Sequence, residues 1–409
     1  MLRLHSLRKK TNMNKFRYRL FLLLFFVFSV FISAAQDIEI RKSGIEKINI
    51  KIDRFSANES DISSSFLNVL KQDLLRSGWF KFGDNKNAYL INMNLIFDKK
   101  IRIEVYIKEY SRKQIIYSFA YSSSLNNHRG LAHKTADKII LCMTGKKGIS
   151  SSKLAIVGSP DGFKELYTCD IDGENLRKVT NDKSIVVAPK WSFDNKSILY
   201  TSYKAGYPNV YQTGRKNSLS NYGGLNVSAS ISPDNKYMAL ILSKDGNPEL
   251  YLKELKTGKL KRLTLTRDAN EASPCWSPYG NEIAYVSDTS GRPHIYVINI
   301  SGGKPRRISK AGSENVSPDW GINGLIAYCS RQSGSYKIVI ADPKNNKLKL
   351  IPLDNADYED PCWAPDGRHI IASRSVNYQS SIYLLDTVEE RRLPLLKQKG
   401  NWFSPSCTY

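Results

Sequence analysis

The chain has 409 residues, of which 41% are hydrophobic and 24% charged, and its formal net charge is +23. This length and apolar content exclude a disordered chain and allow two domains with substantial cores. The basic residues are spread along the sequence, which indicates a Lys-rich solvated surface, with attraction to acidic partners or anionic envelope polymers as the alternative. The six cysteines contain no CxxC pair, and their spacing leaves their disulfide state open.

Residues 1–35 have the pattern of a secretory signal peptide. Residues 1–19 carry seven Lys or Arg and no acid, an apolar stretch runs from Leu20 to Ile32, and Ser33–Ala35 are small. This pattern predicts cleavage after Ala35, which leaves +16 of the formal charge. Because the apolar run is short and no Cys follows it, we expect a soluble exported protein without a membrane anchor or nucleic-acid partner. Either Met1 or Met13 can be the residue at which translation starts.

Residues 36–149 are predicted to form an α+β domain. Amphipathic helices are expected at Ile62–Phe80, where Gly78 acts as a stop signal, and from about Asn127 to Met143. The strands are expected at Ile45–Ile52, Tyr89–Phe97, Ile101–Tyr110 and Gln114–Tyr121. Two helices and a small sheet of this kind pack as two layers.

Residues 150–409 contain a repeat of several short strands. One repeat position recurs about every 40–45 residues and is occupied by Trp191, Ile231, Trp276, Trp320, Trp363 and Cys407. Apolar runs follow in phase at Leu154–Val157, Ile198–Thr201, Met238–Leu242, Ile283–Val286, Leu325–Tyr328 and Ile370–Ala372. This period predicts an all-β, six-bladed β-propeller. Its second blade is expected to be irregular, because Gln212–Gly224 lacks the ending of the other repeats.

The last turn motif, Ser404–Cys407, has no apolar run after it. We therefore expect the C-terminal strand, near Phe403–Tyr409, to close the ring by joining the sheet that begins near Leu154. Closure removes exposed sheet edges. At a fixed repeat position, the tryptophans are expected to pack between blades rather than to form ligand platforms.

Three segments before and at the start of the repeat carry a family resemblance. They are Asp73–Phe80 (DLLRSGWF), Ala132–Ile139 (AHKTADKI) and Thr144–Ile149 (TGKKGI), which lead in this order into P-x-W and SPDG-like turns. In order and spacing they resemble the TolB family, the periplasmic propeller component of the Tol–Pal envelope system.

The resemblance implies a non-catalytic, monomeric binding protein without cofactors. The propeller would take the peptidoglycan-associated lipoprotein Pal at one mouth of its channel and support outer-membrane integrity, invagination during cell division and protein import. An extended N-terminal segment, Gln36–Lys42, would signal towards the inner-membrane protein TolA.

The same resemblance places the Pal contacts in loops just before the P-x-W turns. The corresponding residues here are Leu225, Asn226, Ser228, Asn270, Glu271, Ala272, Asn315, Val316, Tyr358, Glu359 and Asp360. Leu225 and Ala272 depart from the family pattern, in which a histidine and a threonine are expected.

Two other functions stay open: a glycan- or small-ligand-binding propeller, and a propeller hydrolase or lyase. A metal-dependent enzyme needs His and carboxylates that converge, whereas His294 and His369 occupy different phases of the repeat. His128 and His133 are five residues apart on a helix, so their side chains lie on different faces and are not placed to bind the same metal ion. The chain has no G-x-S-x-G elbow or phosphate loop. We therefore assign no catalytic, cofactor or metal residues.

Overall fold

The computed structural model describes residues 46–84, 87–112, 114–351 and 354–409. The expected signal peptide and the segment Gln36–Lys42 lie outside these residues. All of the described residues belong to one compact unit. Among their helices, none has the length and apolar character that a membrane crossing requires.

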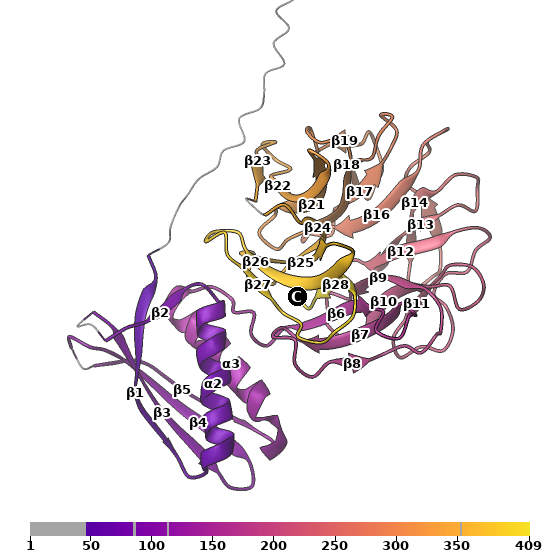
Figure 1. Cartoon of the computed structure of the whole chain (residues 1–409). Helices are drawn as coiled ribbons and strands as arrows, with labels where there is room; N and C mark the ends of the chain where they lie inside the picture. The colour runs from indigo at the N-terminus through magenta and orange to yellow at the C-terminus, as the bar shows by residue number, and fades with distance from the viewer. Residues whose placement is uncertain (1–45, 85–86, 113, 352–353) are drawn as a thin grey trace, which may run out of the picture. The chain divides into compact units, whose positions relative to one another are not determined.

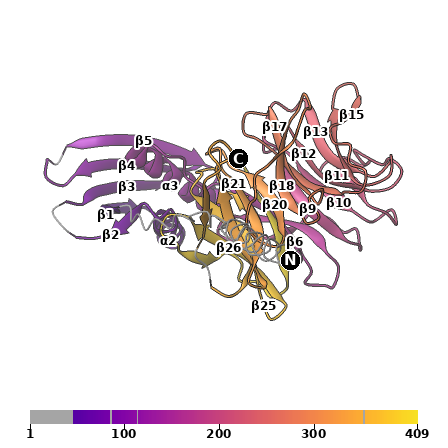
Figure 2. The same cartoon turned by 90° about the horizontal axis from the view of Figure 1, so that it is seen from above.

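The first part of the chain is a five-stranded mixed sheet with two helices packed on it (Figure 1). Its strands follow the order β2-β1-β3-β4-β5, which Figure 2 shows from β5 to β2 across the sheet. The strands are β1 (Ile48–Ala57), β2 (Phe80–Phe82), β3 (Tyr89–Phe97), β4 (Ile101–Glu109) and β5 (Ile115–Ser123). The helices are α2 (Ser60–Arg76) and α3 (His128–Thr144), the latter preceded by the 3-10 turn η1 (Leu125–Asn127). Alternate residues of β4 are buried against the helices, as a half-buried strand requires.

The first helix ends earlier than the sequence predicted. Helix α2 stops at Arg76 rather than Phe80, because Gly78 takes a φ of +70° and its N–H bonds to the carbonyl of Leu75. The chain then turns back, and Phe80–Phe82 form β2, which pairs in parallel with β1. The sequence pattern places Phe80 in the helix and does not indicate this strand.

The rest of the chain is a six-bladed β-propeller, as predicted (Figure 1). Within each blade the strands are antiparallel, and the first strand of the sheet faces the channel. From the channel outward, the blades are β28 (Trp402–Cys407), β6 (Lys153–Gly158), β7 (Glu165–Asp170) and β8 (Arg177–Lys178); β9 (Val186–Trp191), β10 (Ile198–Ser202) and β11 (Asn209–Gln212); β12 (Asn226–Ile231), β13 (Tyr237–Leu242), β14 (Glu249–Glu254) and β15 (Leu260–Arg262); β16 (Glu271–Trp276), β17 (Glu282–Ser287), β18 (His294–Asn299) and β19 (Arg306–Arg307); β20 (Asn315–Trp320), β21 (Ile326–Gln332), β22 (Ser335–Ala341) and β23 (Leu348–Leu350); β24 (Asp357–Trp363), β25 (His369–Val376), β26 (Gln379–Asp386) and β27 (Arg392–Pro394).

The ring closes as the sequence predicted. The C-terminal strand β28 pairs with β6, with Phe403 opposite Val157 and Cys407 opposite Leu154. The first blade is therefore built from both ends of the propeller sequence. The second blade has three strands where the others have four, which confirms the irregularity expected at Gln212–Gly224.

The repeated tryptophans pack between blades. Trp276 and Trp363 are 2% and 6% exposed, so the prediction that they are buried is confirmed. The indole N–H of Trp276 donates to the carbonyl of Ser230 in the preceding blade, at 3.0 Å. All six cysteines are free thiols in the structure.

Candidate functional site: the propeller channel and its mouth

The innermost strands of all six blades share a β-bulge. At each bulge the ladder between the first and second strands shifts its register. One residue per bulge has a φ between 46° and 54°, and these residues are Ala188, Ser228, Ser273, Ser317, Asp360 and Ser404. Short side chains suit this strained backbone, and bulges re-aim side chains next to functional sites.

The bulge residues line a cavity of about 280 Å³ in the centre of the ring. In five of the six blades a proline follows the bulge residue, and all five prolines line the cavity as well. The walls are therefore mostly hydroxyl groups and proline rings. Such a surface mixes polar and apolar groups and carries few charges.

Among the residues that line the channel, Asp360 and Lys190 are the charged ones. Asp360 accepts hydrogen bonds from the hydroxyls of Ser317 (2.8 Å) and Ser404 (2.7 Å), which lie on the two neighbouring blades. Lys190 lies 2.7 Å from the buried Asp319, which also accepts the backbone N–H of Trp363 at 2.8 Å. Although burial opposes its charge, Lys190 has a raised pKa because Asp319 faces it. The Lys190–Asp319 pair joins the second blade to the fifth across the ring, whereas the bonds of Asp360 join adjacent blades.

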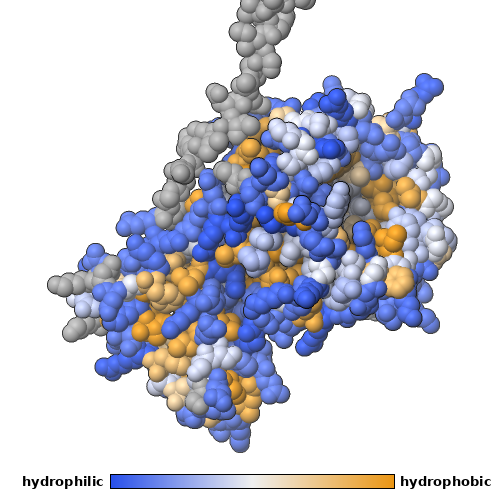
Figure 3. Space-filling view, viewed as in Figure 1, coloured by the Kyte–Doolittle hydropathy of each residue, from blue (hydrophilic) through white to orange (hydrophobic). Residues whose placement is uncertain are grey.

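We call the end of the channel where the first strand of each blade begins the front mouth. The loops between the second and third strands reach the same end, because Asn226 pairs with Leu242 and Leu242 with Glu249. Exposed large apolar side chains collect there: Phe163, Ile185, Tyr207, Leu225, Leu265, Val376 and Tyr378. At the opposite end, the back mouth, the exposed ones are Tyr279, Ile322 and Tyr409. Hydrophilic residues predominate on the face drawn in Figure 3, and apolar residues form separate patches on it.

The residues proposed from the sequence all lie at or near the front mouth, but at different depths. Leu225 is 38% exposed and Asn270 is also exposed, whereas Ala272, Val316 and Glu359 are half-buried. Ser228 and Asp360 line the channel. The other four, Asn226, Glu271, Asn315 and Tyr358, have exposed fractions of 2% or less.

Three of these buried side chains connect one blade to the blade before it. Asn226 accepts hydrogen bonds from the Ser220 hydroxyl (2.7 Å) and the Tyr222 N–H (2.8 Å) of the second blade. The amide of Asn315 lies 3.0 Å from Nδ1 of His294. Such bonds satisfy polar groups that would otherwise be buried without partners.

Glu271 makes the third connection, to the buried Glu249 of the third blade. It accepts hydrogen bonds from Ser287 (2.8 Å) and Thr266 (3.2 Å). Burial and the neighbouring Glu249 raise the pKa of Glu271 from its ordinary 4.5 to about 8, so it holds a proton at neutral pH. Against the cost of burial, hydrogen bonds from Thr264, Glu271 and Arg262 keep the pKa of Glu249 low.

Tyr358 and the propeller histidines are also held within the fold. The Tyr358 hydroxyl donates to Asp354 (3.0 Å) and accepts from Arg374 (3.1 Å). His294 lies 3.0 Å from the Ser309 hydroxyl, and Nδ1 of His369 lies 2.6 Å from Asp366. The two histidines belong to different blades and different networks. In the described part of the chain, one group of side chains could hold a metal ion, and it is formed by His133, Asp170 and Asp172.

The geometry defines a six-bladed β-propeller with a channel lined by hydroxyl groups and proline rings, an apolar-rimmed mouth and an α+β domain before it. The family model of the TolB β-propeller domain matches residues 141–408. The chain therefore belongs to the TolB β-propeller family.

Relatives and solved structures agree with this assignment. The chain is 31% identical over 178 residues to the Tol-Pal system protein TolB of Desulfotalea psychrophila, and 30% identical over 167 residues to that of Desulfosudis oleivorans. These matches cover 42% and 40% of this chain, and 40% and 38% of the relatives' length. TolB from Acinetobacter baumannii has the same fold, with a TM-score of 0.78 and 24% identity over 90% of this chain and 98% of that structure.

Proposed function

We propose that this chain is a non-catalytic periplasmic scaffold of a Tol–Pal system, exported by a signal peptide that is cut after Ala35. Its propeller, from residue 150 onward, binds a Pal-type outer-membrane lipoprotein at the front mouth. Residues 36–149 form the N-terminal α+β domain. Within it, Gln36–Lys42 contact a TolA-type inner-membrane protein. Through these contacts the protein supports outer-membrane integrity and invagination during cell division.

One observation carries the choice of surface. Within the propeller, exposed apolar side chains gather around the front mouth. On soluble proteins, large apolar residues are usually scattered singly over the surface, so such a gathering marks an interaction site. Leu265 and Tyr378 are 81% and 99% exposed, and they belong to loops of different blades. Aromatic and aliphatic anchors surrounded by polar groups are typical of protein interfaces.

The contact surface proposed here differs from the one expected from the sequence. Asn226, Glu271, Asn315 and Tyr358 are buried and bonded within the propeller, so we assign them to shaping the mouth. Leu225, Asn270, Ala272, Val316, Glu359, Ser228 and Asp360 stay in the proposed surface, with Leu265 and Tyr378 added as anchors.

A pull-down from the organism's own envelope extract tests the proposed function. The affinity tag is placed before Gln36, because the C-terminal strand β28 is built into the first blade. We expect a single outer-membrane lipoprotein in the eluate. A bound glycan without protein would favour the ligand-binding alternative, and turnover of an added oligosaccharide would favour a hydrolase or lyase.

A further inference from the structure

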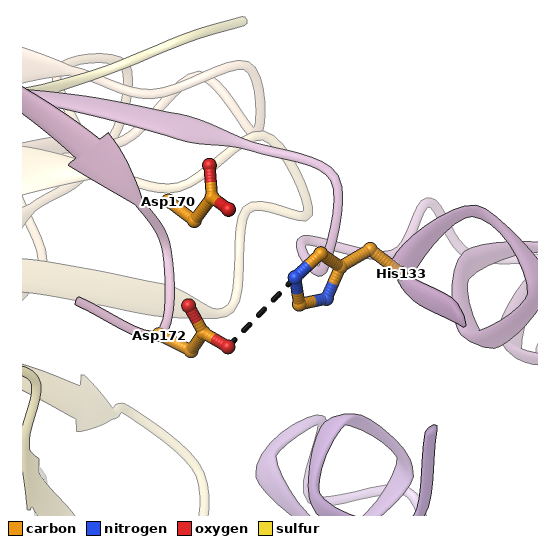
Figure 4. Close-up of side chains that lie close together, drawn as sticks. All are labelled: His133, Asp170 and Asp172. Atoms are coloured by element: carbon orange, nitrogen blue, oxygen red, sulfur yellow. Dashed lines mark ion pairs between the residues drawn. The ribbon is translucent and has the colours of Figure 1, made fainter. Parts of the chain in front are cut away.

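A buried histidine on helix α3 faces the first blade. His133 is 3% exposed, and its Nδ1 lies 2.6 Å from Oδ2 of Asp73 on helix α2. Its other ring nitrogen, Nε2, is buried without a hydrogen-bond partner and lies 3.7 Å from Oδ2 of Asp172 (Figure 4).

Two carboxylates of the first blade lie in front of this nitrogen. Asp170 is the last residue of β7, and Asp172 lies in the turn that follows it. Asp170 is 4% exposed, and the side chain of Asp172 is 9% exposed. One ligand atom from each of the three side chains lies within 4.8 Å of the others.

The geometry around His133 suits a cation. With Nδ1–H donating to the Asp73 carboxylate, Nε2 presents its lone pair to a second carboxylate. Because Nε2 and the Asp172 carboxylate face one another in a buried place, either a proton on Nε2 or a metal ion has to lie between them. A carboxylate bonded to the far nitrogen is also the arrangement that orients metal-binding histidines.

We propose that His133, Asp170 and Asp172 bind a divalent transition-metal ion such as Zn²⁺, which joins helix α3 to the first blade. One imidazole nitrogen, two carboxylate oxygens and a water molecule complete a four-coordinate site. With zinc–ligand bonds of about 2.0–2.2 Å, tetrahedral ligands lie about 3.4 Å apart, so the side chains need to close by roughly an ångström.

Two basic side chains now compensate the carboxylates. Arg129 forms an ion pair with Asp172, and Lys153 forms one with Asp170. The side chains of Lys153 and Arg129 reach solvent, with 55% and 28% of their surface exposed. Both can therefore move away from the oxygens when an ion binds. Arg129 and the metal ion compete for the same carboxylate.

Titration of the metal-free, full-length mature protein with Zn²⁺, followed by calorimetry, tests this proposal. We expect one ion per chain and a higher melting temperature with Zn²⁺, because a ligand that binds the folded state stabilises it. Replacing Asp172 with Asn should weaken binding at least tenfold. The matched control His128→Asn changes a half-buried histidine on the same helix and should leave binding unchanged.

The variant Arg129→Gln distinguishes a metal site from an ion pair that only stabilises the fold. If the arginine competes with the metal, its removal should tighten Zn²⁺ binding several-fold. The absence of binding by the wild type, equal binding by Asp172→Asn, or weaker binding by Arg129→Gln would each overturn the proposal. Circular dichroism of every variant confirms that it is folded.

Discussion

At the scale of single residues, tryptophan packing between blades is a principal stabilising feature of the propeller. Trp276 fills the space between the third and fourth blades and donates its indole N–H to Ser230. The same repeat position holds Trp320 and Trp363, both largely buried. Removing such a side chain takes away apolar contacts, leaves a cavity and orphans a carbonyl.

Trp276→Ala should lower the free energy of unfolding by about 3–5 kcal/mol, the usual range for large-to-small changes in a core. Urea denaturation monitored by circular dichroism measures it. Tyr279→Ala, which changes a 75% exposed ring in the next turn, should have little effect. A loss below about 1 kcal/mol with loss of partner binding would instead identify Trp276 as a binding platform.

The buried pair Glu249 and Glu271 should make stability depend on pH. Because the pKa of Glu271 is raised to about 8, the folded protein keeps a proton that the unfolded chain loses above pH 4.5. The free energy of unfolding should therefore fall as pH rises from about 4.5 to about 8, and this contribution should be flat at higher pH.

Glu271→Gln removes this contribution and keeps the hydrogen-bonding shape of the side chain. Urea denaturation from about pH 5 to 8 should show a shallower decline in the variant than in the wild type. His369, with a pKa raised to about 9, contributes a decline of the same sign to both proteins, so the difference between them reports Glu271. Parallel curves for the two proteins would show that Glu271 is ionised in the folded state.

For the residues at the front mouth, the sequence could predict the position in the repeat but not the extent of burial. Asn226, Glu271 and Asn315 fall in the loop-like stretch before each P-x-W turn, where polar residues are ordinarily exposed. Their burial depends on partners 4–21 positions away, such as Tyr222, Thr266 and His294. Likewise, His133 meets Asp73 and Asp172 through tertiary contacts that no local spacing indicates.

At the scale of secondary-structure elements, closure of the ring depends on a single short strand. β28 is the channel-facing strand of the first blade, and it contributes the bulge residue Ser404 and the buried Trp402 and Cys407. Without it, the edge of β6 and the channel side of the neighbouring blade would be exposed to water.

Deleting residues 401–409 should destabilise the whole propeller in one cooperative transition. Thermal melting followed by circular dichroism should show a transition at a lower temperature, together with aggregation of the exposed edge. Circularly permuting the propeller so that 401–409 directly precede Lys153 should restore the melting temperature, because the same strand fills the same place. A truncated protein that melts like the full-length chain would contradict closure by β28.

The strand pattern was largely predictable because each blade repeats it. β13, β17 and β25 contain the apolar runs identified in the sequence, and their length and period leave little freedom. Short elements were less predictable: β2 has three residues, and its formation depends on pairing with β1 rather than on its own composition.

At the scale of the whole molecule, the propeller presents several loops to one partner. The front mouth combines exposed apolar anchors with a channel of hydroxyls, prolines and Asp360, and each blade contributes to it. The repeat predicted this convergence, since equivalent loops of a ring meet at one rim. The choice of anchors required the structure, because Leu265 and Tyr378 do not occupy equivalent positions of the repeat.

The most direct measurement of the central claim is the affinity of the mature protein for its Pal-type lipoprotein, determined by calorimetry. The double variant Leu265→Ser/Tyr378→Ser should bind roughly tenfold or more weakly, with an unchanged melting temperature, because both side chains are exposed. The matched control Tyr279→Ser, at the back mouth, should bind like the wild type. Normal binding by the double variant, or weakened binding by Tyr279→Ser alone, would contradict recognition at the front mouth.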